Sequence, residues 1–246
     1  MFPVIFVLGL DSGAAGGEVR AAVAANFFNP LKAIAVAFEK QTRHRVDIIS
    51  GSTGKLYAQV THGAPFDLLL AADSRRPRLL VKKGFAVPGS RFTYAVGRLT
   101  LWSPDPGRIA GKGPSVLREN HFNHLAMANP KTAPYGKAAL QTLRKLGIWE
   151  QVGRRVVRGE NIGQAFQFVA SGNAELGFVA LSQVLDPKHK EKGSRWDVPP
   201  SFHDPIVQDM VLLKPGRSNP AARAFAKFIR GSIAREIITG YGYSLE

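Results

Sequence analysis

The sequence predicts an α/β fold of two lobes, and three observations support this class. Apolar runs of strand length alternate with segments whose apolar residues recur at helical spacing, a pattern typical of βαβ units and mostly parallel sheets. This alternating series occurs twice along the chain. Two extended apolar segments, Phe92 to Trp102 and Ile206 to Leu213, connect the two series. We therefore expect two lobes with a ligand cleft between them, crossed twice by the chain.

The first series begins at residue 18. We expect strands over residues 18–27, 45–50 and 66–73, with helices over 30–42 and 54–63. Because Asn29 followed by Pro30 is typical of a helix N-terminus, we predict that the first helix starts at Pro30 with Asn29 as its N-cap. Asn26 would then lie in a loop or in a short irregular turn before this helix.

The second series and the C-terminus repeat the pattern. We expect strands over 124–130, 154–159 and 176–184, helices over 135–147 and 162–172, a strand over 205–213, and terminal helices over 219–239 broken around Gly231. These elements assign residues 18–95 and 207–246 to an N-lobe and residues 96–206 to a C-lobe.

The first 17 residues stand apart from both lobes. An apolar run, Phe2 to Leu10, precedes small residues, as in a signal peptide, but a basic n-region is missing. Residues 1–17 are therefore either the remnant of an export signal or the product of a misassigned start.

Composition restricts the classes of function. The chain has 33 Lys and Arg against 18 Asp and Glu, a net charge of +15, which makes nucleic acid, an acidic membrane surface or an anionic ligand candidate partners. No nucleic-acid recognition motif accompanies the short basic runs, so we expect no nucleic-acid partner. The absence of Cys excludes disulfides, thiolate metal sites and cysteine nucleophiles.

Other chemistry-bearing residues favour structural roles. His121 and His124 lack a third ligand at metal spacing, and no GxSxG elbow occurs. Asp67 and Asp73, which bracket a buried strand, are more typical of turn and cap residues than of a catalytic pair. We therefore expect no enzyme activity and no cofactor.

The turn Gly51 to Gly54 has the features of an anion site. A strand, a Gly/Ser/Thr turn and a helix N-terminus together present free N–H groups and hydroxyls, the general arrangement for holding an anion. It is not a P-loop, because Leu56 rather than Ser or Thr follows Lys55. The alternative is a Ser/Thr helix cap and nothing more.

Three further turns share this chemistry. Because ligands of open α/β sheets bind beyond the carboxyl ends of the strands, we select the strand-to-helix turns at residues 24–27, 51–54, 129–136 and 159–164. Two of these turns belong to each lobe, so they would face one another across the cleft.

These turns carry a resemblance to a known family. The segments "GSTGKLYAQVTHGAPFDLLLAAD", "GSRFTYAVG", "APYG", "NIGQAF" and "ELGFVAL", in this order, resemble the periplasmic molybdate-binding component of molybdate ABC transporters over Glu18 to Leu245. The resemblance implies a type II periplasmic-binding-protein fold and a periplasmic, monomeric, non-enzymatic protein. It also implies molybdate or tungstate as ligand, a membrane permease as partner and no cofactor.

The resemblance also implies the ligand-binding residues. Asn26, Tyr135 and Ile162 would donate through backbone N–H groups, and Thr53 would donate through both hydroxyl and amide. Molybdenum would be bound only as the oxyanion. Many family members have Ser or Thr where this chain has Ala25, so one hydroxyl is absent, and Ser52 is a candidate to replace it. Tyr135→Phe should then be nearly silent in binding, whereas Thr53→Val should not be.

Donors alone suit a fully deprotonated dianion, since a protonated phosphate would need an acceptor. Specificity would then depend on cavity size, with no discrimination between molybdate and tungstate. Three alternatives remain open: the same fold binding sulfate, phosphate or a small carboxylate; the effector module of a transcription regulator; and an enzyme built on this scaffold.

Overall fold

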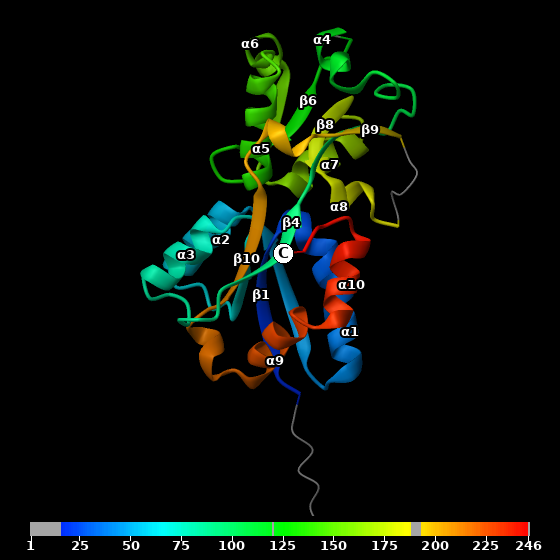
Figure 1. The fold of residues 1–246 in the computed structure, drawn as a ribbon. Helices are drawn as coiled ribbons and strands as arrows, with labels where there is room; N and C mark the ends of the chain where they lie inside the picture. The colour runs from blue at the N-terminus through cyan, green and yellow to red at the C-terminus, as the bar shows by residue number, and fades with distance from the viewer. Residues whose placement is uncertain (1–15, 120, 188–192, 246) are drawn as a thin grey trace, which may run out of the picture.

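The computed structural model describes residues 16–119, 121–187 and 193–245. The protein consists of two α/β lobes, one above the other in Figure 1, and each lobe contains a five-stranded mixed sheet. The expected two-lobed α/β architecture is confirmed. The possible export-signal remnant, residues 1–17, lies outside the described residues apart from its last two positions.

The N-lobe sheet has the strand order β2-β1-β3-β10-β4. Its strands are β1 (Glu18–Ala24), β2 (Arg45–Gly51), β3 (Leu68–Leu70), β4 (Phe92–Gly97) and β10 (Ile206–Leu212). β1 runs parallel to β2 and β3, whereas β10 runs antiparallel to β3 and β4. Alternate residues of β1 enter different cores: Val19, Ala21 and Val23 pack into one, and Ala22 packs into another. Burial on both faces explains why this strand is almost continuously apolar.

Helices cover both faces of this sheet. They are α1 (Phe28–Gln41), α2 (Thr53–Thr61), α3 (Arg75–Lys82), α9 (Pro220–Ile229) and α10 (Ser232–Gly240). Leu31, Ile34 and Phe38 form the buried face of α1 and share a core with Phe225 of α9 and Ile238 of α10. The last helices of the chain therefore complete the lobe in which the described chain begins.

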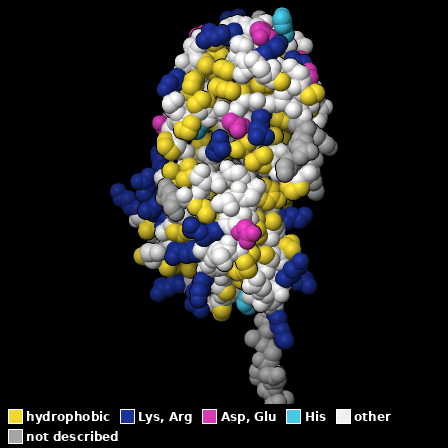
Figure 2. Space-filling view, turned by 45° about the vertical axis from the view of Figure 1, so that its right-hand side comes forward, with side chains coloured by type: hydrophobic (Ala, Val, Ile, Leu, Met, Phe, Trp, Pro, Cys, Tyr) yellow, Lys and Arg dark blue, Asp and Glu magenta, His cyan; other side chains and the backbone are white. Residues whose placement is uncertain are grey.

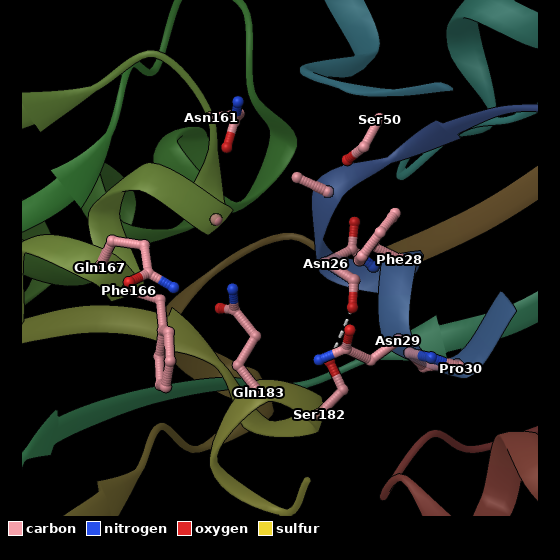
Figure 3. Close-up of a pocket in the computed structure, with 12 residues that line it drawn as sticks. Asn26, Phe28, Asn29, Pro30, Ser50, Asn161, Phe166, Gln167, Ser182 and Gln183 are labelled. Atoms are coloured by element: carbon pink, nitrogen blue, oxygen red, sulfur yellow. Dashed lines mark hydrogen bonds between the residues drawn. The ribbon is translucent and has the colours of Figure 1, made fainter. Parts of the chain in front are cut away.

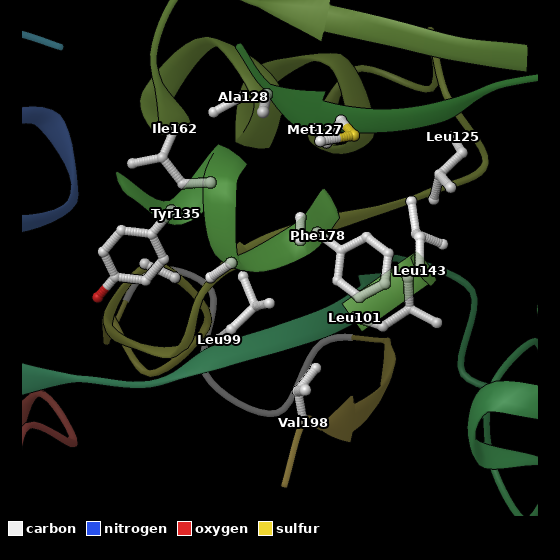
Figure 4. Close-up of a cluster of buried hydrophobic side chains, with 14 of the residues drawn as sticks. Leu99, Leu101, Leu125, Met127, Ala128, Tyr135, Leu143, Ile162, Phe178 and Val198 are labelled. Atoms are coloured by element: carbon white, nitrogen blue, oxygen red, sulfur yellow. The ribbon is translucent and has the colours of Figure 1, made fainter. Parts of the chain in front are cut away.

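The C-lobe sheet has the order β7-β6-β8-β5-β9. Its strands are β5 (Leu99–Ser103), β6 (Leu125–Ala128), β7 (Val156–Gly159), β8 (Leu176–Ala180) and β9 (Ser194–Asp197), and its helices are α4 (Val116–Glu119), α5 (Pro134–Lys145), α6 (Trp149–Val152), α7 (Ile162–Ala170) and α8 (Leu181–Val184). Leu101, Met127 and Phe178 from three strands pack against Leu143 and Tyr135 of α5 (Figure 4). This core holds the N-terminus of α5 at the edge of the lobe.

The chain crosses between the lobes twice. It leaves the N-lobe sheet at the end of β4 and enters the C-lobe sheet with β5, and it returns from β9 to β10. β4 and β10 pair with each other up to Gly97 and Ile206, at the end nearer the C-lobe. The two strands therefore connect the lobes side by side, and we call this connection the hinge.

Two expectations at the start of the N-lobe were wrong. The first helix begins at Phe28, and its N-cap is Phe27 without a side-chain hydrogen bond. Asn29 instead donates from Nδ2 to Oδ2 of Asp186 at 2.7 Å. Pro30 is tolerated as the third helical residue because the N–H groups of the first turn have no intrahelical acceptor. The strand expected over 18–27 ends at Ala24, and Ala25–Phe27 form a 3₁₀ turn.

The strand expected over 176–184 also ends early, at Ala180, and continues as the short helix α8. Conversely, β9 has the polar sequence SRWD and was not expected. Within the described residues, no helix has the length and apolar character needed to span a membrane. Lys and Arg side chains are distributed along the whole face shown in Figure 2, with few acidic side chains among them.

Candidate functional site

The six predicted site residues surround one small cavity between the lobes. Its walls consist of Ala24, Ala25, Asn26, Gly51, Ser52, Thr53, Ala72, Ala133, Pro134, Tyr135, Asn161 and Ile162. The cavity has a volume of about 10 Å³, far below the ~300–1,000 Å³ typical of sites for drug-sized ligands. None of these lining residues is charged. The cavity therefore suits a compact ligand held by neutral groups.

The N-lobe contributes two strand-to-helix junctions to the cavity. After β1, Asn26 is the second residue of the 3₁₀ turn, a position where the backbone N–H has no acceptor within the turn. After β2, Thr53 is the first residue of α2 and is fully buried. Its Oγ1 accepts a hydrogen bond from the Ala72 N–H at 3.0 Å. Because this contact uses a lone pair, the hydroxyl proton of Thr53 remains available to a ligand.

Ser52 serves as the N-cap of α2, since its Oγ accepts from the Lys55 N–H at 3.4 Å. A serine helix cap is therefore present at this turn. A cap and an anion site are compatible here, because the serine hydroxyl accepts in the cap and keeps its own proton.

The C-lobe contributes the N-termini of α5 and α7. Tyr135 is the second residue of α5, after Pro134, and Ile162 is the first residue of α7. The backbone N–H groups at these positions have no intrahelical acceptor, and the helix dipole adds partial positive charge there. Asn161 caps α7 by accepting from the Gln164 N–H at 3.0 Å. Four chain segments from two lobes thus present N–H groups around one cavity.

Direct contacts join the lobes around this cavity. The Gly54 N–H donates to the Thr132 carbonyl at 2.9 Å, and Lys55 Nζ lies 2.6 Å from Glu160 Oε1. On the hinge side, Ser182 Oγ donates to the Asn26 carbonyl at 2.9 Å (Figure 3). The structure is therefore a closed arrangement of the two lobes.

Two larger crevices adjoin the cavity. The first, of about 310 Å³, shares Ala25, Asn26 and Asn161 with it and has only uncharged side chains in its walls (Figure 3). The second, of about 240 Å³, shares Ala72, Ala133 and Pro134. Its charged side chains are Asp73, Arg75, Arg76, Lys131, Lys137 and Asp204. Both crevices also lie between helix N-termini of the two lobes, but neither is lined by Ser52, Thr53, Tyr135 or Ile162, which all line the small cavity.

The two acids that bracket β3 have structural partners, as predicted. Asp67 Oδ2 accepts from the Arg20 N–H at 2.8 Å. Asp73 Oδ1 accepts from the Arg76 N–H at 2.8 Å, and its other oxygen forms an ion pair with the same arginine. The cap role predicted for Asp73 is confirmed, whereas Asp67 binds the backbone of β1 and was wrongly expected in a turn or cap.

A buried polar cluster lies behind the cavity, and the sequence-based prediction missed it. Asn26 Nδ2 donates to Gln208 Oε1 at 2.7 Å and to the Tyr243 hydroxyl at 3.0 Å. Burial raises the pKa of Tyr243 to about 12 and raises the pKa of Tyr135 well above its ordinary value, so both phenols are neutral at physiological pH. The one available signal was a Gln inside the otherwise apolar start of "IVQDMVLL".

Comparisons with known proteins agree with this architecture. Residues 19–244 match the family of bacterial extracellular solute-binding proteins. The chain is 52% identical over 237 residues to the molybdate-binding protein ModA of Azotobacter vinelandii, covering 96% of this chain and 94% of that protein. It is 50% identical over 240 residues to the molybdate-binding protein ModA of Rhodobacter capsulatus, covering 98% of this chain and 93% of that protein.

A solved structure shows the same fold. The periplasmic molybdate-binding protein of Azotobacter vinelandii superposes with a TM-score of 0.89 and 42% identity, covering 93% of this chain and 99% of that one. The family model spans nearly the whole chain, and both relatives match it over nearly their full length. The chain is therefore a member of the bacterial extracellular solute-binding protein family.

Proposed function

We propose that the protein captures molybdate or tungstate in the cavity between its lobes and delivers the oxyanion to the permease of an ABC transporter. One observation carries the proposal: N–H and hydroxyl donors from four segments of two lobes surround a cavity whose lining residues include no charged side chain. A dianion accepts hydrogen bonds at every oxygen, so a set of donors alone matches it. Fixed backbone dipoles at helix N-termini balance its charge without a counter-ion.

Each predicted residue has a specific proposed role. Asn26, Tyr135 and Ile162 donate hydrogen bonds from their backbone N–H groups. Thr53 donates from its hydroxyl and its amide, and Ser52, the cap of α2, donates from its hydroxyl. Ala25 lines the cavity without a polar side chain, at the position where many family members have a hydroxyl. Molybdenum enters only as the oxyanion, with no bond from a protein atom to the metal.

The choice of molybdate over other anions is supported by the relatives. Two proteins named for molybdate binding share about half of their residues with this chain over nearly its whole length. We expect the spacing of the donors to decide between the anions, because sulfate has the same charge and the same acceptors on shorter bonds. Tungstate nearly equals molybdate in size, so we expect equal affinity for these two ions.

We also propose the compartment in which the protein acts and its oligomeric state. The protein acts outside the cytoplasm, in the periplasm, as a monomer that binds neither a cofactor nor nucleic acid and catalyses no reaction. Its N-lobe comprises residues 18–95 and 207–246, and its C-lobe comprises 96–206. These boundaries lie within β4 and β10, the strands of the hinge.

Thermal unfolding of anion-stripped protein tests the proposal. Molybdate at about a thousand times its dissociation constant adds ~4 kcal/mol to the native state, which corresponds to a rise in Tm of roughly 8–16 °C for a chain of this size. We expect this rise with molybdate and with tungstate, and little change with sulfate or phosphate at the same concentration. A larger rise with sulfate or phosphate would assign the site to that anion, and no rise with any of them would contradict an oxyanion site.

A further inference from the structure

Gln208 is the centre of the buried polar cluster at the hinge. It lies on β10 and has no exposed surface. Its Oε1 accepts from Asn26 Nδ2 at 2.7 Å and from the Tyr94 hydroxyl at 3.0 Å, and its Nε2 donates to the Tyr135 hydroxyl at 3.3 Å. One side-chain amide therefore contacts both lobes.

Two of the residues bonded to this amide, Asn26 and Tyr135, also belong to the proposed ligand site. Asn26 and Tyr135 supply backbone donors from opposite lobes in the proposed site. The turn that contains Asn26 is held further by its own carbonyl, which accepts from the Tyr243 hydroxyl at 2.8 Å and from Ser182 Oγ at 2.9 Å. Any change in the contact between Gln208 and Tyr135 would thus alter the separation of two anchored donor groups.

The surrounding backbone leaves room for this contact. Gly97, at the end of β4, faces the amide: a Cβ added there would lie 2.5 Å from Gln208 Nε2 and would overlap the Tyr135 hydroxyl. The pairing of β10 with β4 shifts register between Gln208 and Asp209. Both hinge strands therefore accommodate the side chains that meet there.

Tyr135 is placed to connect its lobe to the hinge. Its ring packs at the edge of the C-lobe core, and its hydroxyl points away from the leucine and phenylalanine side chains (Figure 4). The expectation that Tyr135→Phe would be silent considered only the backbone N–H of this residue. The hydrogen bond to Gln208 gives the hydroxyl a role of its own.

We propose that Gln208 is a positioning residue that fixes the spacing between the donors of the two lobes and thereby favours molybdate over the smaller sulfate. This inference rests on the proposed function. A buried amide that is hydrogen-bonded through both its oxygen and its nitrogen resists displacement, because moving it leaves buried polar groups unpaired. A fixed spacing leaves hydrogen bonds to sulfate stretched, whereas a spacing that can relax lets the lobes close on the smaller ion.

Isothermal titration with sodium molybdate and sodium sulfate tests this role. The variants are Gln208→Met, which keeps the side-chain length without the amide, and Tyr135→Phe, which removes only the hydroxyl of the partner. We expect each to lower the ratio of molybdate to sulfate affinity by about tenfold, the order of effect expected when one buried hydrogen bond is lost. Because the two residues act through one contact, the ratio of molybdate to sulfate affinity in the double variant should fall by less than the product of the two single-variant factors.

Met210→Leu is the matched control. It changes a buried residue of the same strand that belongs to the N-lobe core and has no side-chain N–H or O–H group, so it perturbs packing without removing a hydrogen bond of the cluster and should leave the affinity ratio within about twofold of the wild type. A purely structural Gln208 would lower the Tm of the ligand-free protein and leave the ratio unchanged, and that outcome overturns the inference. If Gln208→Met does not fold, the ratio of molybdate to sulfate affinity measured for Tyr135→Phe tests the inference instead. Failure of the wild-type protein to bind molybdate contradicts the proposed function itself.

Discussion

The backbone N–H of Gly54 donates to the carbonyl oxygen of Thr132 at 2.9 Å, so the two lobes meet main chain to main chain at the rim of the cavity. A Cβ at residue 54 would lie 2.9 Å from that oxygen and 3.1 Å from Nη2 of Arg76. Only glycine allows this approach without displacement of a neighbour. The closed arrangement therefore depends on the absence of a side chain at this position.

Gly54→Ala should weaken ligand binding while sparing the fold. Overpacking at the rim costs about 1–3 kcal/mol, so we expect molybdate affinity to fall about tenfold or more. The free energy of unfolding of the ligand-free protein should stay the same or increase, because alanine stabilises a helical turn such as the first turn of α2 by up to ~1 kcal/mol relative to glycine. Calorimetric titration and chemical unfolding measure the two quantities.

Gly240→Ala provides the control for this variant. Residue 240 ends α10, and an added Cβ there meets no atom within 4 Å, so both quantities should stay near their wild-type values. Unchanged affinity in Gly54→Ala would show that closure does not need the contact with Thr132.

Thr53→Val should reduce both affinity and stability. The isosteric change removes the hydroxyl proton proposed to reach the anion, and a hydrogen bond to a charged group contributes ~1.5–3 kcal/mol. It also leaves the Ala72 N–H, which donates to Thr53 Oγ1 at 3.0 Å, without its acceptor. Titration with molybdate should therefore show a fall of about 10- to 100-fold. Thr53→Ser keeps the hydroxyl and should retain most of the affinity; equal binding by the Val and Ser variants would exclude the hydroxyl from the site.

A hydroxyl at position 25 should strengthen binding. Ala25 is half-buried in the cavity wall, and Ala25→Ser would add a donor worth ~1.5–3 kcal/mol if it reaches the anion. Comparison of Ala25→Thr with Ala25→Val isolates the hydroxyl, because the two side chains have nearly the same shape. We expect the Thr variant to bind molybdate about tenfold more tightly than the Val variant, or better, as measured by titration. No difference between them would mean that position 25 lies beyond hydrogen-bonding reach of the ligand.

Ile162→Pro should remove one donor with little change in backbone. Ile162 is the first residue of α7, where proline is well tolerated, and Asn161 before it is extended, with φ −140° and ψ 175°, as a residue preceding proline prefers to be. Loss of its N–H should cost ~1.5–3 kcal/mol of binding free energy. Ile162→Ala shortens the side chain but keeps the N–H. If titration gives the same affinity for the two variants, Ile162 does not donate to the ligand.

The periodicity of apolar residues predicted the two lobes well because it reflects which side chains are buried. β1 is apolar from Ala21 to Ala24 because cores lie on both of its faces there, and the two terminal helices separate at Gly231 as expected. β9 escaped prediction because its polar residues pair with β5 through main-chain hydrogen bonds, which leave no trace in hydropathy. The start of α1 was misplaced because Asn29 pairs with Asp186, which is distant in sequence.

The chain segments that line the candidate cavity were predictable from the sequence. Strand-to-helix junctions are visible in the sequence, and their placement beyond the strand ends follows from the fold class. The role of Gln208 could not be predicted, because a polar residue in an apolar run does not reveal its partners. Its contacts with Asn26 and Tyr135 join residues 182 and 73 positions apart, and only the folded hinge brings them together.

The cavity wall built from main-chain amides has an evolutionary consequence. Every residue except proline carries the same N–H group, so under the proposed function a side chain outside the buried polar cluster, such as that of Ile162, can diverge while its N–H donor stays in place. What natural selection must preserve is the bend of the chain where each strand passes into its helix. If the proposed site is correct, anion recognition of this kind would be inherited as backbone shape and would tolerate changes in residue identity at Ile162.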